Sequence, residues 1–261
     1  MSANNDSISK TLIVTISLCA VCAVLVSVAA VGLKPLQVAN KELDKKTNVL
    51  AAANIDATGK DINELFDSSV VARVLDLQTN TWADDIDPTT YDALKAVKDP
   101  ARTITLTPAE DLADIKRHAR YKTLYMVKDG DTVETLILPI HGKGLWSTLY
   151  GFMALEGDFN TVVGLGFYAH AETPGLGGEV DNPRWKALWP GKEVYAGDNT
   201  EHAALALIKG TVDPTNKDAV HQIDGLAGAS LTSKGVTNLV EFWLSENGYS
   251  PFLAKLRKGE V

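Results

Sequence analysis

The chain has 261 residues, of which 45% are hydrophobic and 22% are charged, proportions that exclude a wholly disordered protein. This length suits one sizeable domain or two small ones. The formal net charge is -8 and no cluster of Lys and Arg is present, which argues against a nucleic-acid partner.

The segment 11–33, TLIVTISLCAVCAVLVSVAAVGL, contains no charged residue. About 20 apolar residues cross a bilayer as a helix, whereas the apolar core of a cleaved signal peptide has about 7–15. We therefore expect a single transmembrane anchor at 11–33, after a short tail at 1–10 and before one domain at 34–261. A small-x-small pattern at 27–29 leaves a cleaved signal peptide as the alternative.

Both cysteines, Cys19 and Cys22, lie inside this apolar segment. In a helix facing lipid they are more typical of soft apolar side chains than of redox or metal chemistry. The rest of the chain has no cysteine, so it forms no disulfide and no thiolate-bound cluster. Redox chemistry in the domain would need an organic cofactor.

After the anchor, the pattern predicts a juxtamembrane helix at 34–55, a helix at 59–66 and a strand at 69–79. A further helix is expected from Thr107, with Pro108 in its first turn and Glu110 at the capping-box position.

The clearest β region follows. Segments 121–127 and 132–140 flank KDGD, in which Asp-Gly is a strong hairpin signal, and segments 146–157 and 160–170 form a second pair. Four strands joined by short turns predict an antiparallel meander. The fold class is therefore α+β: one N-terminal transmembrane helix, then a twisted antiparallel sheet flanked by helices.

Three elements are expected after the meander. Trp185 and Trp189 stand one helical turn apart and should pack together, and 203–210 reads as a strand. A closing helix is expected at about 233–247. Its buried face would consist of Val236, Leu239, Val240 and Trp243.

Several sequence patterns are candidates for a ligand-binding, metal or phosphate site. ETPGLGGEV at 172–180 lacks the third glycine of a dinucleotide-binding motif, and indicates either a tight turn or a glycine surface against a flat ligand. Trp146 is either a core residue or the edge of a ring-binding site. The five histidines are scattered without a metal-site spacing, so no metal site is expected, and no P-loop motif is present.

Ser230 lies in DGLAGASLTSKGV at 224–236, just before the closing helix. It could be a helix cap, a role that Thr232 or Ser233 could fill equally well. It could be a hydrolase nucleophile, but the second glycine of G-x-S-x-G is missing and only His221 is near in sequence as a base. It could also carry a phosphate, because free N–H groups at a helix N-terminus attract phosphate.

The run DGLAGAS at 224–230 resembles the flavinylation motif, Asp-x-x-Ser/Thr-Gly-Ala-Thr/Ser, of FMN-binding domains in membrane redox complexes. With GLWS, ETPGLGGEV, NPRWKALW and FWLSENGYSPFLAKLR, it makes the chain similar to the C subunit of Na+-translocating NADH:quinone oxidoreductases over nearly its whole length. The related G subunit of Rnf electron-transport complexes is an alternative, which the NPRWKALW and C-terminal blocks disfavour.

The resemblance implies a covalent FMN, joined through its phosphate to a Ser or Thr hydroxyl by a separate Mg2+-dependent flavin transferase that uses FAD. Carried onto this chain, Ser230 is the acceptor, and Asp224, Gly228 and Ala229 are recognised by the transferase. The family usually has threonine where this chain has Ser230, and often Ser or Thr where it has Ala227. Serine keeps the hydroxyl but lacks the methyl group that restricts χ1.

The resemblance also implies that the isoalloxazine ring lies between the GLW and ETPGL segments. The cofactor-binding residues expected there are Trp146, Glu172, Thr173, Leu176 and Gly177, with Leu231 and Thr232 near the ribityl phosphate.

By the same resemblance, the chain is an electron-carrier subunit that passes single electrons through its FMN. The whole complex oxidises NADH, reduces ubiquinone and translocates Na+, and this chain alone would do none of these. Its partners would be the other subunits, the flavin transferase and the membrane. The remaining alternative is a structural membrane subunit without flavin.

Two indications disagree on the orientation. Lysines following the apolar segment, at 34, 41, 45 and 46, weakly indicate a cytoplasmic domain. The family places the domain on the periplasmic side of the bacterial inner membrane, and that is the side we expect.

Overall fold

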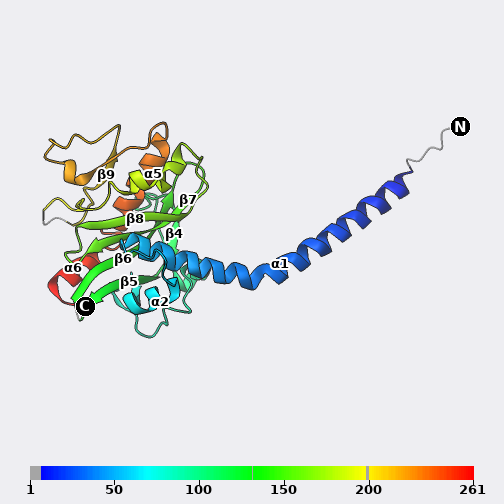
Figure 1. Ribbon diagram of the computed structural model, residues 1–261, viewed down its shortest axis with the longest axis horizontal. Coiled ribbons are helices and arrows are strands. Elements are labelled where there is room, and N and C mark those ends of the chain that lie inside the picture. Colours follow the sequence, from blue (N-terminus) through cyan, green and yellow to red (C-terminus); the bar gives the residue numbers. More distant parts are fainter. Residues whose placement is uncertain (1–6, 131, 198–199) are drawn as a thin grey trace. The chain divides into compact units, whose positions relative to one another are not determined.

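The computed structural model describes residues 7–130, 132–197 and 200–261, which form two compact units divided between residues 44 and 45. The first unit is the N-terminal part of α1 (Ile8–Ala52), a helix of 45 residues (Figure 1). This helix is long and apolar enough to cross a membrane, with a mean hydropathy of 2.8 over its most apolar window. The juxtamembrane helix predicted at 34–55 is its continuation. Within the expected tail at 1–10, residues 1–6 lie outside the described residues.

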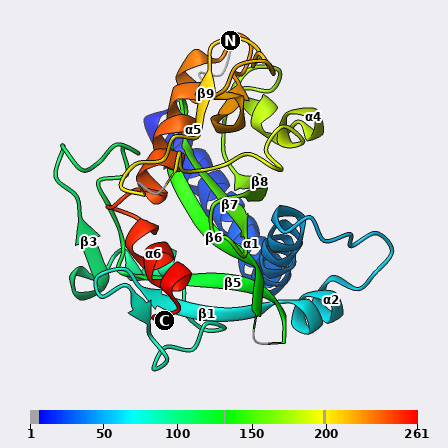
Figure 2. The same ribbon diagram turned by 90° about the vertical axis from the view of Figure 1, so that its left-hand side faces the viewer.

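The second unit is built on a six-stranded antiparallel sheet with the order β2-β1-β5-β6-β7-β8 (Figures 1 and 2). The strands are β1 (Val71–Asp76), β2 (Thr81–Trp82), β5 (Tyr121–Asp129), β6 (Thr132–Lys143), β7 (Thr148–Glu156) and β8 (Val162–Ala169). The predicted four-strand meander is confirmed as β5 to β8. The expected α+β class, one apolar helix followed by a sheet with flanking helices, is confirmed as well.

Shorter elements complete the unit. The helices are α2 (Ile62–Ser69), α3 (Ala93–Ala96), α4 (Pro183–Lys186), α5 (Ser230–Trp243) and α6 (Ser250–Lys258). The 3-10 turns are Pro100–Arg102, Gly177–Asp181 and Ala219–His221. Two small sheets pair β3 (Thr103–Thr105) with β4 (Arg117–Ala119) antiparallel, and β9 (Ala206–Ile208) with β10 (Gln222–Asp224) parallel.

The strand period of two divides the sheet's side chains between two hydrophobic cores. On β5, Leu124 and Met126 face the larger core, whereas Tyr125 between them faces the other. The larger core is closed by α5 and α6, and the buried face of α5 predicted from the sequence is confirmed. Trp185 and Trp189 pack edge to face within this core, with ring centroids 5.4 Å apart, as expected.

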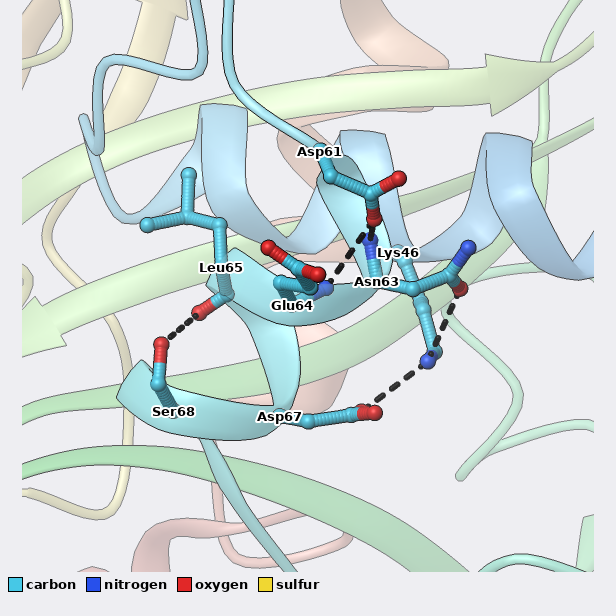
Figure 3. Close-up of polar contacts among 7 residues, drawn as sticks. All are labelled: Lys46, Asp61, Asn63, Glu64, Leu65, Asp67 and Ser68. Carbon is cyan, nitrogen blue, oxygen red and sulfur yellow. Dashed lines mark hydrogen bonds and ion pairs between the residues drawn. The ribbon is translucent and has the colours of Figure 1, made fainter.

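The last turns of α1 and helix α2 cover the other face of the sheet, where Val49 and Leu50 are fully buried. Asp61 caps α2 by accepting the N–H of Asn63 at 2.8 Å (Figure 3). Lys46 joins the two helices, with its Nζ 3.0 Å from a carboxylate oxygen of Asp67 (Figure 3). These contacts fix the end of α1 on the domain.

The helix predicted from Thr107 is wrong, because the segment forms turns. The capping-box bond is present, since Glu110 accepts the N–H of Thr107 at 2.8 Å. However, the Asp111 carboxylate accepts the N–H groups of Ile115 and Lys116, which bends the chain back on itself. The chain then enters β4, which pairs with β3.

The closing helix also differs from the prediction. α5 begins three residues earlier, at Ser230, and ends at Trp243. Tyr249 then donates its N–H to the carbonyl of Trp243 at 2.7 Å, and a second helix, α6, follows. Gly248 is needed at this turn, because a Cβ there would overlap the Trp243 carbonyl. The predicted strand at 203–210 is present in shortened form as β9.

One buried cation stands out in the larger core. Lys122 on β5 is 5% exposed, and its Nζ lies 4.6 Å from the ring centroid of Trp243. Burial lowers the pKa of Lys122 to about 7. Because an unfolded lysine has a pKa of about 10.4, the unfolded chain binds more protons between about pH 7 and 10, and this group makes stability rise with pH in that window.

We therefore expect Lys122→Met to stabilise the full-length protein in detergent at pH 7 by about 1–3 kcal/mol, because the desolvation cost of the ammonium group is removed. The gain should shrink towards pH 10, where the wild-type lysine is neutral. Thermal unfolding at both pH values measures this. Lys128→Met, on an exposed position of the same strand, is the control, and an equal gain there would contradict the explanation.

Candidate functional site

Three loops meet around a cavity of about 160 Å³ in the second unit. They are the loop after β6, the loop after β8 and the segment that leads into α5. The lining residues are Leu145, Trp146, Glu172, Thr173, Leu176, Gly177, Gly228, Ala229 and Thr232. Six of these residues, Trp146, Glu172, Thr173, Leu176, Gly177 and Thr232, were expected as cofactor-binding residues, whereas Gly228 and Ala229 were expected as part of the motif that the transferase recognises.

The carboxylate of Glu172 holds the three loops together. It is buried, with only 5% of the residue exposed. Oε1 accepts the backbone N–H of Trp146 at 2.9 Å and of Ser147 at 3.3 Å. Oε2 accepts the N–H of Leu145 at 3.3 Å and the hydroxyl of Thr232, the third residue of α5, at 2.7 Å. One side chain thus bonds the loop after β6 and the first turn of α5.

These bonds decide the protonation state of Glu172. Burial raises the pKa of its carboxyl group, but the hydrogen bonds from Thr232 and from the amides of residues 145–147 outweigh burial and hold the pKa below its ordinary value. The group is therefore ionised at neutral pH.

Glycines let the loops approach this carboxylate. A Cβ on Gly177 would lie 2.5 Å from the Thr232 hydroxyl and 2.7 Å from Glu172 Oε2, and a Cβ on Gly144 would lie 2.5 Å from Oε1. Gly175 has a φ of +76°, in the left-handed region. The glycine cluster at 172–180 is therefore a turn built around the Glu172 carboxylate.

His170 fixes both ends of the loop after β8. Its Nδ1 accepts the N–H of Glu172 at 3.2 Å, so the ring proton lies on Nε2, which donates to Asp181 at 2.7 Å. The loop is also bonded to the loop after β6, where the Ser147 hydroxyl accepts the N–H of Ala171 at 2.7 Å. Sequence reasoning missed His170, which lies two residues before the ETPGL segment, and it did not single out Leu145, although Leu145 lies inside the GLW segment that it identified.

The three hydroxyls at the start of α5 have different surroundings. Thr232 is fully buried and donates to Glu172, and the Ser233 hydroxyl accepts the N–H of Leu226 at 2.9 Å. Ser230 is exposed, and its hydroxyl makes no hydrogen bond to any residue that the structure describes. Only the Ser230 hydroxyl is therefore open to a reaction partner.

The same turn offers free backbone donors. The N-cap residue of α5 is Ala229, whose side chain cannot cap the helix. The amides of the first three residues, 230–232, have no intrahelical carbonyl to bind. Ser230 therefore does not serve as the N-cap, because it is the first residue of the helix itself. A small anion could bind at this helix end.

Ser230, Leu231 and Asp224 do not line the cavity. Leu231 lies beside it and is 61% exposed. The carboxylate of Asp224 accepts the N–H of Val212 at 2.8 Å, and its carbonyl accepts the indole N–H of Trp185 at 3.0 Å. Asp224 therefore stabilises the segment before the helix through bonds within the protein.

No histidine among the described residues is hydrogen-bonded to Ser230. His221, the base considered for a hydrolase, has its Nδ1 2.8 Å from the carbonyl of Glu193. A serine nucleophile needs a base within hydrogen-bond reach, and the described part of the chain shows none at Ser230.

The family model of the FMN-binding domain matches residues 144–245, a range that contains all three loops of the cavity. The C subunit of the Na(+)-translocating NADH-quinone reductase of Pseudomonas aeruginosa is 56% identical, covering 99% of this chain and all of that protein. The C subunit of the same reductase from Vibrio alginolyticus is 48% identical over the full length of both chains. The chain belongs to this C-subunit family. The crystal structure of NqrC from Shewanella oneidensis matches with a TM-score of 0.76 and 32% identity, covering 84% of this chain and 99% of that one.

The residues at the cavity fit the flavin that the family's FMN-binding domain implies. The rim of the cavity is apolar and exposed, as a flat ring system requires. Its side chains are Leu145, Trp146, Leu176 and Leu231, between 41% and 66% exposed. The free amides at the start of α5 suit a phosphate group. The cavity thus offers an apolar part and an anion-binding part side by side.

A substitution at Gly177 tests how closely the loops pack around the Glu172 carboxylate. We expect Gly177→Ala to lower the free energy of unfolding by about 1–3 kcal/mol, because its Cβ would overlap Thr232 and Glu172. The control is Gly166→Ala on β8, whose Cβ would meet only the Lys186 ammonium at 4.0 Å. Unfolding of both variants in denaturant measures the difference. Equal effects at the two positions would contradict the close approach at Gly177.

Proposed function

We propose that this protein carries FMN attached through a phosphoester to Ser230, and that it passes single electrons through this flavin within the reductase complex. The observation that carries the proposal is the exposed, unbonded Ser230 hydroxyl at an uncapped helix end beside the cavity. The bound flavin supplies the redox chemistry. The chain supplies attachment, orientation and electrostatics.

The residues have separate roles in this proposal. The Ser230 hydroxyl forms the ester, and the amides of residues 230–232 bind the phosphate oxygens, with Leu231 and Thr232 beside them. Trp146 and Leu176, both exposed at the rim, contact the ring system, while Glu172, Thr173 and Gly177 form the wall. Asp224, Gly228 and Ala229 are the positions that the flavin transferase recognises.

The size of the cavity supports a role in electron exchange. At about 160 Å³ it is smaller than the roughly 300–1,000 Å³ of pockets that enclose small ligands. Part of the flavin therefore stays outside the cavity, open to neighbouring subunits that give and take electrons. A covalent bond keeps such a weakly enclosed cofactor in place between electron transfers.

The anchor and orientation belong to the same proposal. The apolar part of α1, at 11–33, crosses the inner membrane once, and the domain at 34–261 lies on the periplasmic side. The other subunits of the complex, the transferase and the membrane are its partners.

Mass spectrometry of the full-length protein produced with a flavin transferase tests the attachment. Trypsin releases residues 218–234 as one peptide, which contains Ser230, Thr232 and Ser233. We expect the mass of an FMN phosphoryl group on this peptide, localised to Ser230 by fragmentation. The modification should disappear in Ser230→Ala and persist in Ser230→Thr and Thr232→Val. An unmodified Ser230 beside an active transferase would overturn the covalent attachment.

The orientation is tested by reporters fused after Val261. Alkaline phosphatase, which needs periplasmic disulfide formation, should be active there, and a cytoplasmic fluorescent protein should not fluoresce. Inactive alkaline phosphatase together with a fluorescent reporter would place the domain in the cytoplasm. The lysines after the apolar segment would then indicate the orientation correctly.

A further inference from the structure

We propose that the ionised carboxylate of Glu172 is a fixed negative charge in the wall of the flavin site and lowers the reduction potential of the bound flavin. The inference rests on the proposed function, because it needs an FMN in the cavity. It assigns Glu172 an electrostatic role in addition to its structural one.

The charge of Glu172 has no counter-charge. All its hydrogen-bond donors are neutral: the Thr232 hydroxyl and the amides of residues 145–147. No Lys, Arg or His of the described residues forms an ion pair with it. Neutral dipoles stabilise a carboxylate without cancelling its charge, so a full negative charge stays beside the cavity.

Holding the loops together does not by itself require a charged side chain. Three backbone amides and one hydroxyl could also be satisfied by neutral acceptors such as loop carbonyls. Glu172, however, lines a cavity in which the family's cofactor binds. The position of the charge points to an effect on that cofactor.

Coulomb repulsion gives the direction of the effect. The oxidised isoalloxazine ring is neutral. It becomes one charge more negative when it takes up one electron without a proton, or two electrons with one proton. A nearby carboxylate repels this added charge, and burial weakens the screening by water. Reduction becomes less favourable, so the potential is lower than it would be beside a neutral side chain.

The midpoint potential of the flavinylated full-length protein in detergent tests the proposal, with dithionite as the electron donor in a spectroscopic titration. We expect Glu172→Gln to raise the potential. Ser147→Ala is the matched control, because it removes a hydrogen bond between the same two loops but leaves the Glu172 carboxylate and its donors in place. Asp181→Asn removes a half-exposed carboxylate that fixes the same loop through His170, and should change the potential little.

The outcomes separate this inference from the proposed function. Protein without covalent FMN in the mass spectrum contradicts the function. Flavinylated Glu172→Gln with the wild-type potential overturns the charge effect. An equal shift in Ser147→Ala overturns it too, because loop position would then set the potential.

A second measurement serves if Glu172→Gln fails to fold or to bind flavin. The wild-type potential is then followed from neutral to acidic pH, in parallel with Asp181→Asn and His170→Asn, the titratable neighbours on this loop. The flavin's own proton uptake makes the midpoint potential depend linearly on pH. Protonation of Glu172 should raise the potential above this line in all three proteins. A potential that follows that line throughout would overturn the proposal.

Discussion

The hydrogen bonds to the Glu172 carboxylate are the constraint on which the site depends. They join the loop after β6 to the first turn of α5, two parts of the chain that no strand pairing connects. The loop after β8 supplies the carboxylate and is itself fixed by His170 and Asp181. A single buried side chain thus links three loops into a defined cavity wall.

Glycines provide the space that the hydrogen bonds to Glu172 require. Gly144 and Gly177 leave the space in which the carboxylate lies, and Gly235 lets α5 pack on the backbone of residues 143 and 144. Hydrogen bonds lose strength steeply with distance, so a single added methyl group at these positions would separate the donors from their acceptor. The glycines therefore contribute to the electrostatics of the site as much as to its shape.

Much of the fold could be predicted from the sequence because its signals are local. The meander followed from alternating apolar residues and short turns, and the face of α5 from its helical period. The helix expected at Thr107 failed because the Asp111 side chain competes for the amides of Ile115 and Lys116, and no periodicity reports such a bond. The helix α6 was missed because it follows α5 after one tight turn at Gly248.

The members of the site could be named from the sequence, but not their roles. The resemblance to the family identified Glu172 and Thr232 as cofactor contacts, and the structure adds that they are bonded to each other. The same is true of the hydroxyls. Three of them lie within residues 230–233, and the sequence alone offers each as a cap. The hydrogen bonds of Thr232 and Ser233 within the protein are what distinguish these two hydroxyls from that of Ser230.

The start of α5 shows how the fold combines a structural and a chemical role in one turn. Ordinarily a Ser, Thr, Asp or Asn side chain caps a helix, and its loss costs about 1 kcal/mol. Here Ala229 leaves the amides free, and the turn is held instead through Thr232 and Ser233, whose bonds lie on the buried side. The exposed side keeps unsatisfied donors next to the exposed Ser230 hydroxyl. A phosphate bound there would serve as the missing cap, so that attachment of the cofactor and stabilisation of the helix would be the same event.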